Sequence, residues 1–184
     1  MASIEILLPA PLHKPARPQR EARHVWKELP ERPVLGLIDN GKGRANDILE
    51  AVARELQVRG LIDSFFIWRK GSAGKPITAA ERADTLARAD LVLSGVGDCG
   101  SCSSCTLHDA VLCSAEGAPA AAIITTPFQK LAQATAINLG VPSIPVIVIE
   151  HPIWTRDPAW IEETAARVCD TVAQQIFQGQ KVMQ

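Results

Sequence analysis

The sequence has little net charge, and this excludes one class of partner. Its 184 residues contain 19 basic and 20 acidic side chains, which give a formal net charge of −1 at pH 7. Such a balance provides no basic field to attract phosphates and no acidic tail. We therefore expect no nucleic-acid partner.

Long apolar runs and targeting segments are also lacking. The chain starts Met-Ala-Ser-Ile-Glu, without a basic segment followed by an apolar one, and its longest apolar stretches have the length of a strand. A membrane-spanning helix needs about 20 apolar residues. No repeat of solenoid period is visible either. We expect a soluble, cytoplasmic protein that does not bind a membrane.

Proline is concentrated at one end of the chain. Residues 1–33 carry six of the 13 prolines and show no sustained period of 2 or 3.6. This pattern predicts an extended N-terminal arm over residues 1–32 and a single α/β domain over residues 33–184. An arm of this kind either wraps a neighbouring subunit or stays mobile. We expect a homo-oligomer, or a subunit of a hetero-oligomer held through the arm.

Short apolar runs alternate with amphipathic stretches from residue 33 onward, which is typical of repeated βα units. A capping-box pattern at Thr78 and Glu81 opens one of the helices, and the pair Asp157-Pro158 opens the last. Another helix is predicted to begin at about Cys102 or Ser103. The predicted strands cover residues 34–39, 61–68, 91–96, 119–125 and 144–149. The pattern predicts a flavodoxin-like or Rossmann-like three-layer sandwich with about five parallel strands.

Polar loops follow each predicted strand. Because parallel strands end at one edge of the sheet, these loops should meet there, where ligands bind in such folds. Ordinary turn chemistry is the alternative for any single loop. The loops cover residues 39–42, 69–75, 97–105, 125–128 and 150–152. The side chains expected to bind substrate are Asn40, Lys42, Lys70, Ser72, Ser101 and Thr126.

Three of the five cysteines lie within seven residues, at the junction between a predicted strand and a predicted helix. Unpaired N–H groups and the helix dipole stabilise a thiolate at such a junction. This favours Cys99 as a nucleophile and Cys102 as the resolving thiol. His151 follows a buried strand, so it is well placed to protonate a leaving group, with the neighbouring acid Asp98 as a further candidate.

A metal site is the alternative interpretation of the same cysteines. Cys99, Cys102 and Cys105 have a spacing that can hold zinc or an iron-sulfur cluster. The fourth ligand would be His108, Asp109 or His151. An inert cysteine cluster is the third possibility. We favour thiol chemistry without a cofactor, and we assign no role to the two remaining cysteines, Cys113 and Cys169.

With these residues laid out, the chain resembles the UGSC family, which is named for a selenocysteine-Gly-Ser-Cys motif. Residues 95–102 read Gly-Val-Gly-Asp-Cys-Gly-Ser-Cys, with cysteine at the selenocysteine position, and a His-Asp pair follows at residues 108–109. The resemblance covers roughly residues 33–178. The family is in turn similar to the selenoprotein B subunits of the glycine, sarcosine, betaine and proline reductases. In those proteins a selenol or thiol attacks carbon and displaces an amine.

Three functions follow as hypotheses. The leading one is a thiol-dependent oxidoreductase or lyase in which Cys99 attacks an activated small molecule, or exchanges disulfides, and Cys102 resolves the adduct. The second is a metal- or cluster-dependent lyase or hydratase. The third is a non-catalytic subunit of a larger complex.

Overall fold

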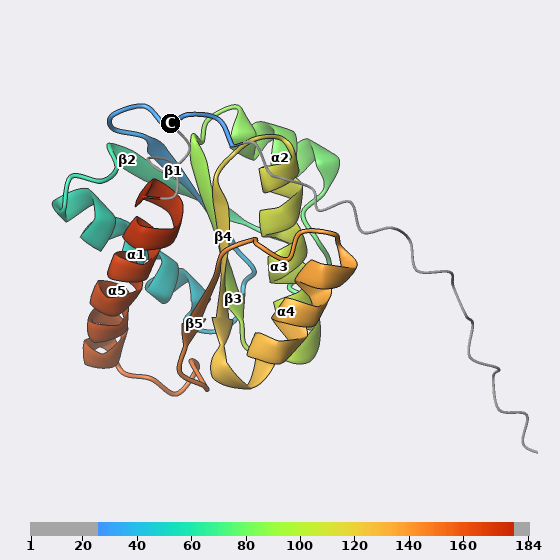
Figure 1. The fold of residues 1–184 in the computed structure, drawn as a ribbon. Helices are drawn as coiled ribbons and strands as arrows, with labels where there is room; N and C mark the ends of the chain where they lie inside the picture. The colour runs from blue at the N-terminus through green and yellow to red at the C-terminus, as the bar shows by residue number, and fades with distance from the viewer. Residues whose placement is uncertain (1–25, 179–184) are drawn as a thin grey trace, which may run out of the picture.

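Strands and helices alternate along the chain in the computed structural model, which describes residues 26–178 (Figure 1). The strands are β1 (Val34–Asp39), β2 (Ser64–Arg69), β3 (Leu91–Gly97), β4 (Ala120–Thr125) and β5 (Val146–Ile149). The helices are α1 (Ala45–Val58), α2 (Ala79–Leu86), α3 (Gly100–Ala115), α4 (Gln129–Asn138) and α5 (Pro158–Val172). A 3-10 turn at Thr126–Phe128 precedes α4, and a π-helical turn at Ala173–Gln178 follows α5.

The five strands form one parallel sheet in the order β2-β1-β3-β4-β5. This is the flavodoxin-like order, in which the chain reverses its winding direction between β1 and β3. The predicted α/β sandwich is therefore confirmed. At this reversal, the loops after β1 and β3 leave toward opposite faces of the sheet. The crevice between them is where ligands bind in such folds.

Helices cover both faces of the sheet (Figure 1). On one face, α1 and α5 pack together over a core that includes Leu49, Leu93 and Val168. On the other, α3 and α4 cover a second core that includes Leu107 and Ile124. All residues of β3 and β4 are buried, which explains why their sequences are almost entirely apolar or small.

Element boundaries differ from the predicted ones where local hydrogen bonds intervene. The second strand begins at Ser64 rather than at residue 61, because the Leu61 N–H donates to the Leu56 carbonyl and closes α1. The fifth begins at Val146 rather than at residue 144, because the Ile144 N–H closes a turn on Val141. The cysteine-rich helix begins earlier than predicted, at Gly100.

Most of the predicted arm over residues 1–32 lies outside the described residues, which begin at residue 26. Its described end runs along the C-terminal end of α3. The Trp26 indole donates to the Ser114 hydroxyl at 2.7 Å, and the Lys27 N–H donates to the Gly117 carbonyl at 2.7 Å. Between residues 26 and 178, none of the helices is both long enough and apolar enough to span a bilayer.

Candidate functional site

The cysteine pair lies where β3 passes into α3, at the carboxyl edge of the sheet. Cys99 is the N-cap of α3, with an extended backbone, and a disulfide joins it to Cys102. The Cys99 Sγ accepts a hydrogen bond from the Cys102 N–H at 3.4 Å, and the Ser101 hydroxyl lies 3.7 Å from the same sulfur. The first turn of the helix thus directs polar groups toward the Cys99 sulfur.

The two bonded cysteines differ in their access to solvent. Cys99 is partly exposed, whereas Cys102 is 1% exposed on the inner side of α3. A reagent that approaches from solvent therefore reaches Cys99 first.

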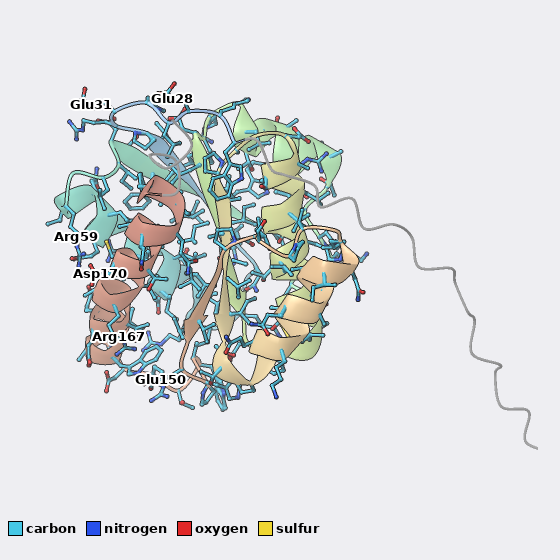
Figure 2. All side chains as sticks on the ribbon, in the orientation of Figure 1. Glu28, Glu31, Arg59, Glu150, Arg167 and Asp170 are labelled. Carbon is cyan, nitrogen blue, oxygen red and sulfur yellow. A yellow bond between two sulfur atoms is a disulfide. The ribbon has the colours of Figure 1, made fainter. Side chains whose placement is uncertain are left out.

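A carboxylate-imidazole pair lies directly beside Cys99. The Asp98 Oδ1 is 2.7 Å from the Nδ1 of His151, which follows β5, and the Asp98 Oδ2 accepts from the Ile153 N–H at 3.4 Å. The Asp98 side chain is 10% exposed and that of His151 is 35% exposed. Glu150, labelled in Figure 2, marks the same end of the sheet. The structure thus brings together two of the predicted catalytic residues, which are 53 positions apart.

Two further side chains hold the His151 ring. The Thr125 hydroxyl lies 3.3 Å from His151 Nδ1, and the Phe128 ring packs edge-on against the imidazole with centroids 5.8 Å apart. Sequence reasoning assigned neither of these residues a role. Thr125 ends β4, and Phe128 lies in the 3-10 turn that follows. The segment 125–128 was predicted to reach this edge, but a threonine at the end of an apolar strand resembles any other strand residue.

Asn40 was predicted to bind substrate, but its amide is directed inward. It is 2% exposed, and its Nδ2 donates to the Val96 carbonyl at 2.7 Å and to the Thr106 hydroxyl at 3.2 Å. Its Oδ1 accepts from the Lys42 N–H at 3.1 Å. Asn40 therefore ties the end of β3 and the middle of α3 to the loop after β1.

Lys70 does not extend into the crevice as predicted. Its ammonium is buried, 2.5 Å from the Asp109 carboxylate, and it also donates to the Lys75 carbonyl at 2.8 Å. Asp109 additionally accepts from the Ile77 N–H at 2.6 Å and lies 3.4 Å from the Ser94 hydroxyl. Burial raises the pKa of Asp109, and the charge of Lys70 opposes that shift. The lysine charge thus serves this ion pair rather than a ligand at the sheet edge.

The other predicted substrate-binding residues lie on the surface. Lys42, Ser72, Ser101 and Thr126 are exposed. The Ser72 hydroxyl accepts from the Gly74 N–H at 3.3 Å within its own loop. Substrate binding by these four side chains stays a prediction.

The three remaining cysteines are buried free thiols. Burial raises the pKa of Cys105, that of Cys113 to about 12 and that of Cys169 to about 11. These thiols are therefore protonated at neutral pH.

The alternative metal centre at Cys99, Cys102 and Cys105 is not assembled in the structure. Over residues 26–178, no three His, Cys, Asp or Glu side chains gather in a group that would hold a metal ion. Two of the three predicted ligand sulfurs are instead bonded to each other.

The chain is similar to one protein family and to several solved structures. The family model described as UGSC family matches residues 5–178. No curated protein matches the chain significantly. Among solved structures, a diflavin flavoprotein A3 from Nostoc sp. is similar, with 13% sequence identity and a TM-score of 0.47. That match covers 83% of this chain and 97% of the other. The range matched by the family model contains every side chain of the site.

Proposed function

Because the chain belongs to the UGSC family, we propose that it is a thiol-dependent enzyme. In this proposal Cys99 attacks an activated small molecule and Cys102 resolves the adduct. The observation that carries the proposal is the asymmetric cysteine pair, in which the partly exposed sulfur lies at a helix N-terminus and the other is buried behind it. Such an arrangement favours a thiolate at the outer position.

The first step is nucleophilic substitution at carbon. The Cys99 thiolate forms a bond to a substrate carbon, and the bond between that carbon and its leaving heteroatom breaks, with its electron pair going to the heteroatom. Protonated His151 gives its proton to the leaving group. The adjacent Asp98 carboxylate, 2.7 Å from Nδ1, accepts a hydrogen bond from that nitrogen and orients the ring for this step.

The second step reduces the substrate and oxidises the protein. The Cys102 thiolate attacks the Cys99 sulfur, the carbon–sulfur bond breaks, and its electron pair goes to carbon, which takes up a proton from solvent. The products are the reduced substrate and the Cys99–Cys102 disulfide, the form that the structure contains. A thiol reductant from solution then exchanges with the disulfide at Cys99 and restores both thiols. Disulfide exchange with a sulfur substrate uses the same atoms.

Substrate binding is assigned to the exposed polar side chains of the same edge. Ser101 lies beside the attacking sulfur, and its hydroxyl can donate to charge that develops there. We extend the proposal to Lys42, Ser72 and Thr126, which are exposed in the segments that follow β1, β2 and β4. The positive charge of Lys42 suits an anionic group on the substrate.

Alkylation of the reduced protein tests this proposal. At pH 7, mass spectrometry after brief iodoacetamide treatment should find Cys99 modified about tenfold or more faster than Cys105, Cys113 or Cys169, because a first-turn thiolate is populated and a buried thiol is not. The fast phase should disappear in Cys99→Ser and persist in the matched control Cys169→Ser.

Cys102→Ser supplies a second measurement. Treated with oxidised glutathione instead of iodoacetamide, this variant should form a mixed disulfide at Cys99, releasing one glutathione thiolate, but should not resolve it, so that the adduct accumulates in the intact mass. Modification spread evenly over all five cysteines, or an adduct that decays equally fast in Cys102→Ser, would contradict the proposed roles.

A further inference from the structure

Thr125 links the two halves of the site through one buried hydroxyl. It is the last residue of β4 and is 0% exposed. Its Oγ1 donates to the carbonyl of Gly97, the last residue of β3, at 3.2 Å. The same oxygen lies 3.3 Å from His151 Nδ1. The hydroxyl therefore stands between the strand that leads into the cysteine pair and the imidazole after β5.

The direction of these two contacts follows from the single hydrogen that the Thr125 hydroxyl carries. A carbonyl oxygen only accepts, so the single hydroxyl hydrogen of Thr125 is directed to Gly97. Toward His151 the hydroxyl then offers a lone pair, which accepts a hydrogen from Nδ1. The Asp98 carboxylate, on the same nitrogen, also accepts. Both neighbours thus require a hydrogen on Nδ1.

We propose that Thr125 is a positioning residue that holds His151 in the Nδ1–H tautomer, so that Nε2 is the nitrogen that exchanges protons with the reacting groups. This role rests on the proposed function. Neutral His151 then presents a lone pair at Nε2, and protonated His151 presents Nε2–H. Because Thr125 carries no charge, it selects the tautomer whether or not Asp98 is ionised.

The charges around His151 do not change when Thr125 is replaced, so the effect of the hydroxyl on the tautomer can be measured separately from theirs. The charged groups beside the ring and its backbone are Asp98, Glu150 and Arg156. The Arg156 guanidinium donates to the His151 carbonyl at 3.3 Å and lies 3.4 Å from the Glu150 carboxylate. Replacement of Thr125 leaves all three charges in place. A changed tautomer in a Thr125 variant therefore reports the lost hydroxyl.

The test compares Thr125→Val, which removes the hydroxyl at nearly constant volume, with Thr125→Ser, which keeps it. Thr125→Ala provides a second variant without the hydroxyl if valine disturbs folding. The matched control is Thr171→Val, on α5, whose hydroxyl donates within its own helix to the Arg167 carbonyl at 3.5 Å. Nitrogen-15 NMR of the imidazole, assigned with His151→Asn, reads the tautomer directly. The pH profile of Cys99 alkylation is the second measurement.

Wild-type protein, Thr125→Ser and Thr171→Val should show a single Nδ1–H tautomer. Because Asp98 still accepts from Nδ1 in these variants, the hydroxyl is tested in an Asp98→Ala background. There Thr125→Val and Thr125→Ala should show a mixed population while unchanged Thr125 keeps the Nδ1–H tautomer, and the part of the alkylation rate that depends on His151 should fall about three- to tenfold, as expected from the loss of one hydrogen bond. An unchanged tautomer in both hydroxyl-free variants overturns the inference. Failure of the proposed function looks different: wild-type Cys99 would then react no faster than the buried thiols, whatever the NMR shows.

Discussion

Replacement of Lys70 with methionine is expected to lower the free energy of unfolding by about 3–5 kcal/mol, because it leaves a buried carboxylate without its counter-charge. The two side chains of this ion pair are 3% and 0% exposed, so solvent does not screen the remaining Asp109 charge. Asp109 would keep only its contacts with the Ile77 N–H and the Ser94 hydroxyl. Urea unfolding of the purified variant measures the loss.

This loss should depend on pH in a defined direction. Burial already raises the pKa of Asp109, and removal of Lys70 removes the charge that opposes this shift. The folded variant therefore holds a proton that the unfolded chain releases above about pH 3.9. Because the folded state then binds more protons, its stability falls as pH rises through this window. Lys70→Met should be closest to wild type in acid and weakest near neutrality.

The double variant Lys70→Met/Asp109→Asn is the control for this result. It removes both charges but keeps an amide oxygen for the Ile77 N–H, so most of the lost stability should return and the added pH dependence should disappear. Equal stabilities of Lys70→Met and wild type at neutral pH would show that the pair contributes nothing beyond its surroundings.

A second large effect is expected from Gly97→Ala, immediately before the site. An added Cβ would lie 2.6 Å from Ile124 Cδ1 and 2.7 Å from the backbone Cα of Ser103. Backbone cannot rotate away, so the first turn of α3 must shift. We expect a loss of about 1–3 kcal/mol in unfolding free energy, together with slower alkylation of Cys99, since the displaced turn no longer directs its N–H group at the sulfur.

Gly100→Ala is the matched control for the Gly97 variant. It lies on the other side of Cys99, and the nearest atom to its added Cβ is Leu131 Cδ2 at 4.0 Å. This substitution should leave both stability and Cys99 reactivity close to wild type. If Gly97→Ala behaved like Gly100→Ala, close packing of β3 against α3 would not be what positions the cysteines.

The fold was predictable because its signals are local. The first strand, residues 34–39, has the predicted bounds, and the capping box at Thr78 and Glu81 is present at the start of α2. The boundaries that differ are set by hydrogen bonds to residues several positions away, such as that from the Ile144 N–H to Val141. Apolar content identifies a strand, but it does not show at which residue the backbone hydrogen bonds belong to a turn instead of the sheet.

The site was predictable only as far as the topology brings loops together. Strand order places Asp98 and His151 at one edge, and both were predicted to act there. Side-chain direction was not predictable, because it depends on which face of the sheet each residue meets. Lys70 was therefore predicted to be a cation in a loop at the site. Its side chain instead contacts Asp109, 39 residues later in the chain.

The contacts of Trp26 and Lys27 affect where the chain can be shortened. A protein cut at residue 33, the predicted domain start, would lose the indole that covers the Ser114 hydroxyl and the N–H that pairs with Gly117. Ser114 lies in the last turn of α3 and Gly117 just after the helix ends, opposite the end that holds the cysteines. A shortened protein that starts before Trp26 should melt at a higher temperature than one that starts at residue 33, and a truncation series followed by thermal unfolding would locate the minimal folding unit.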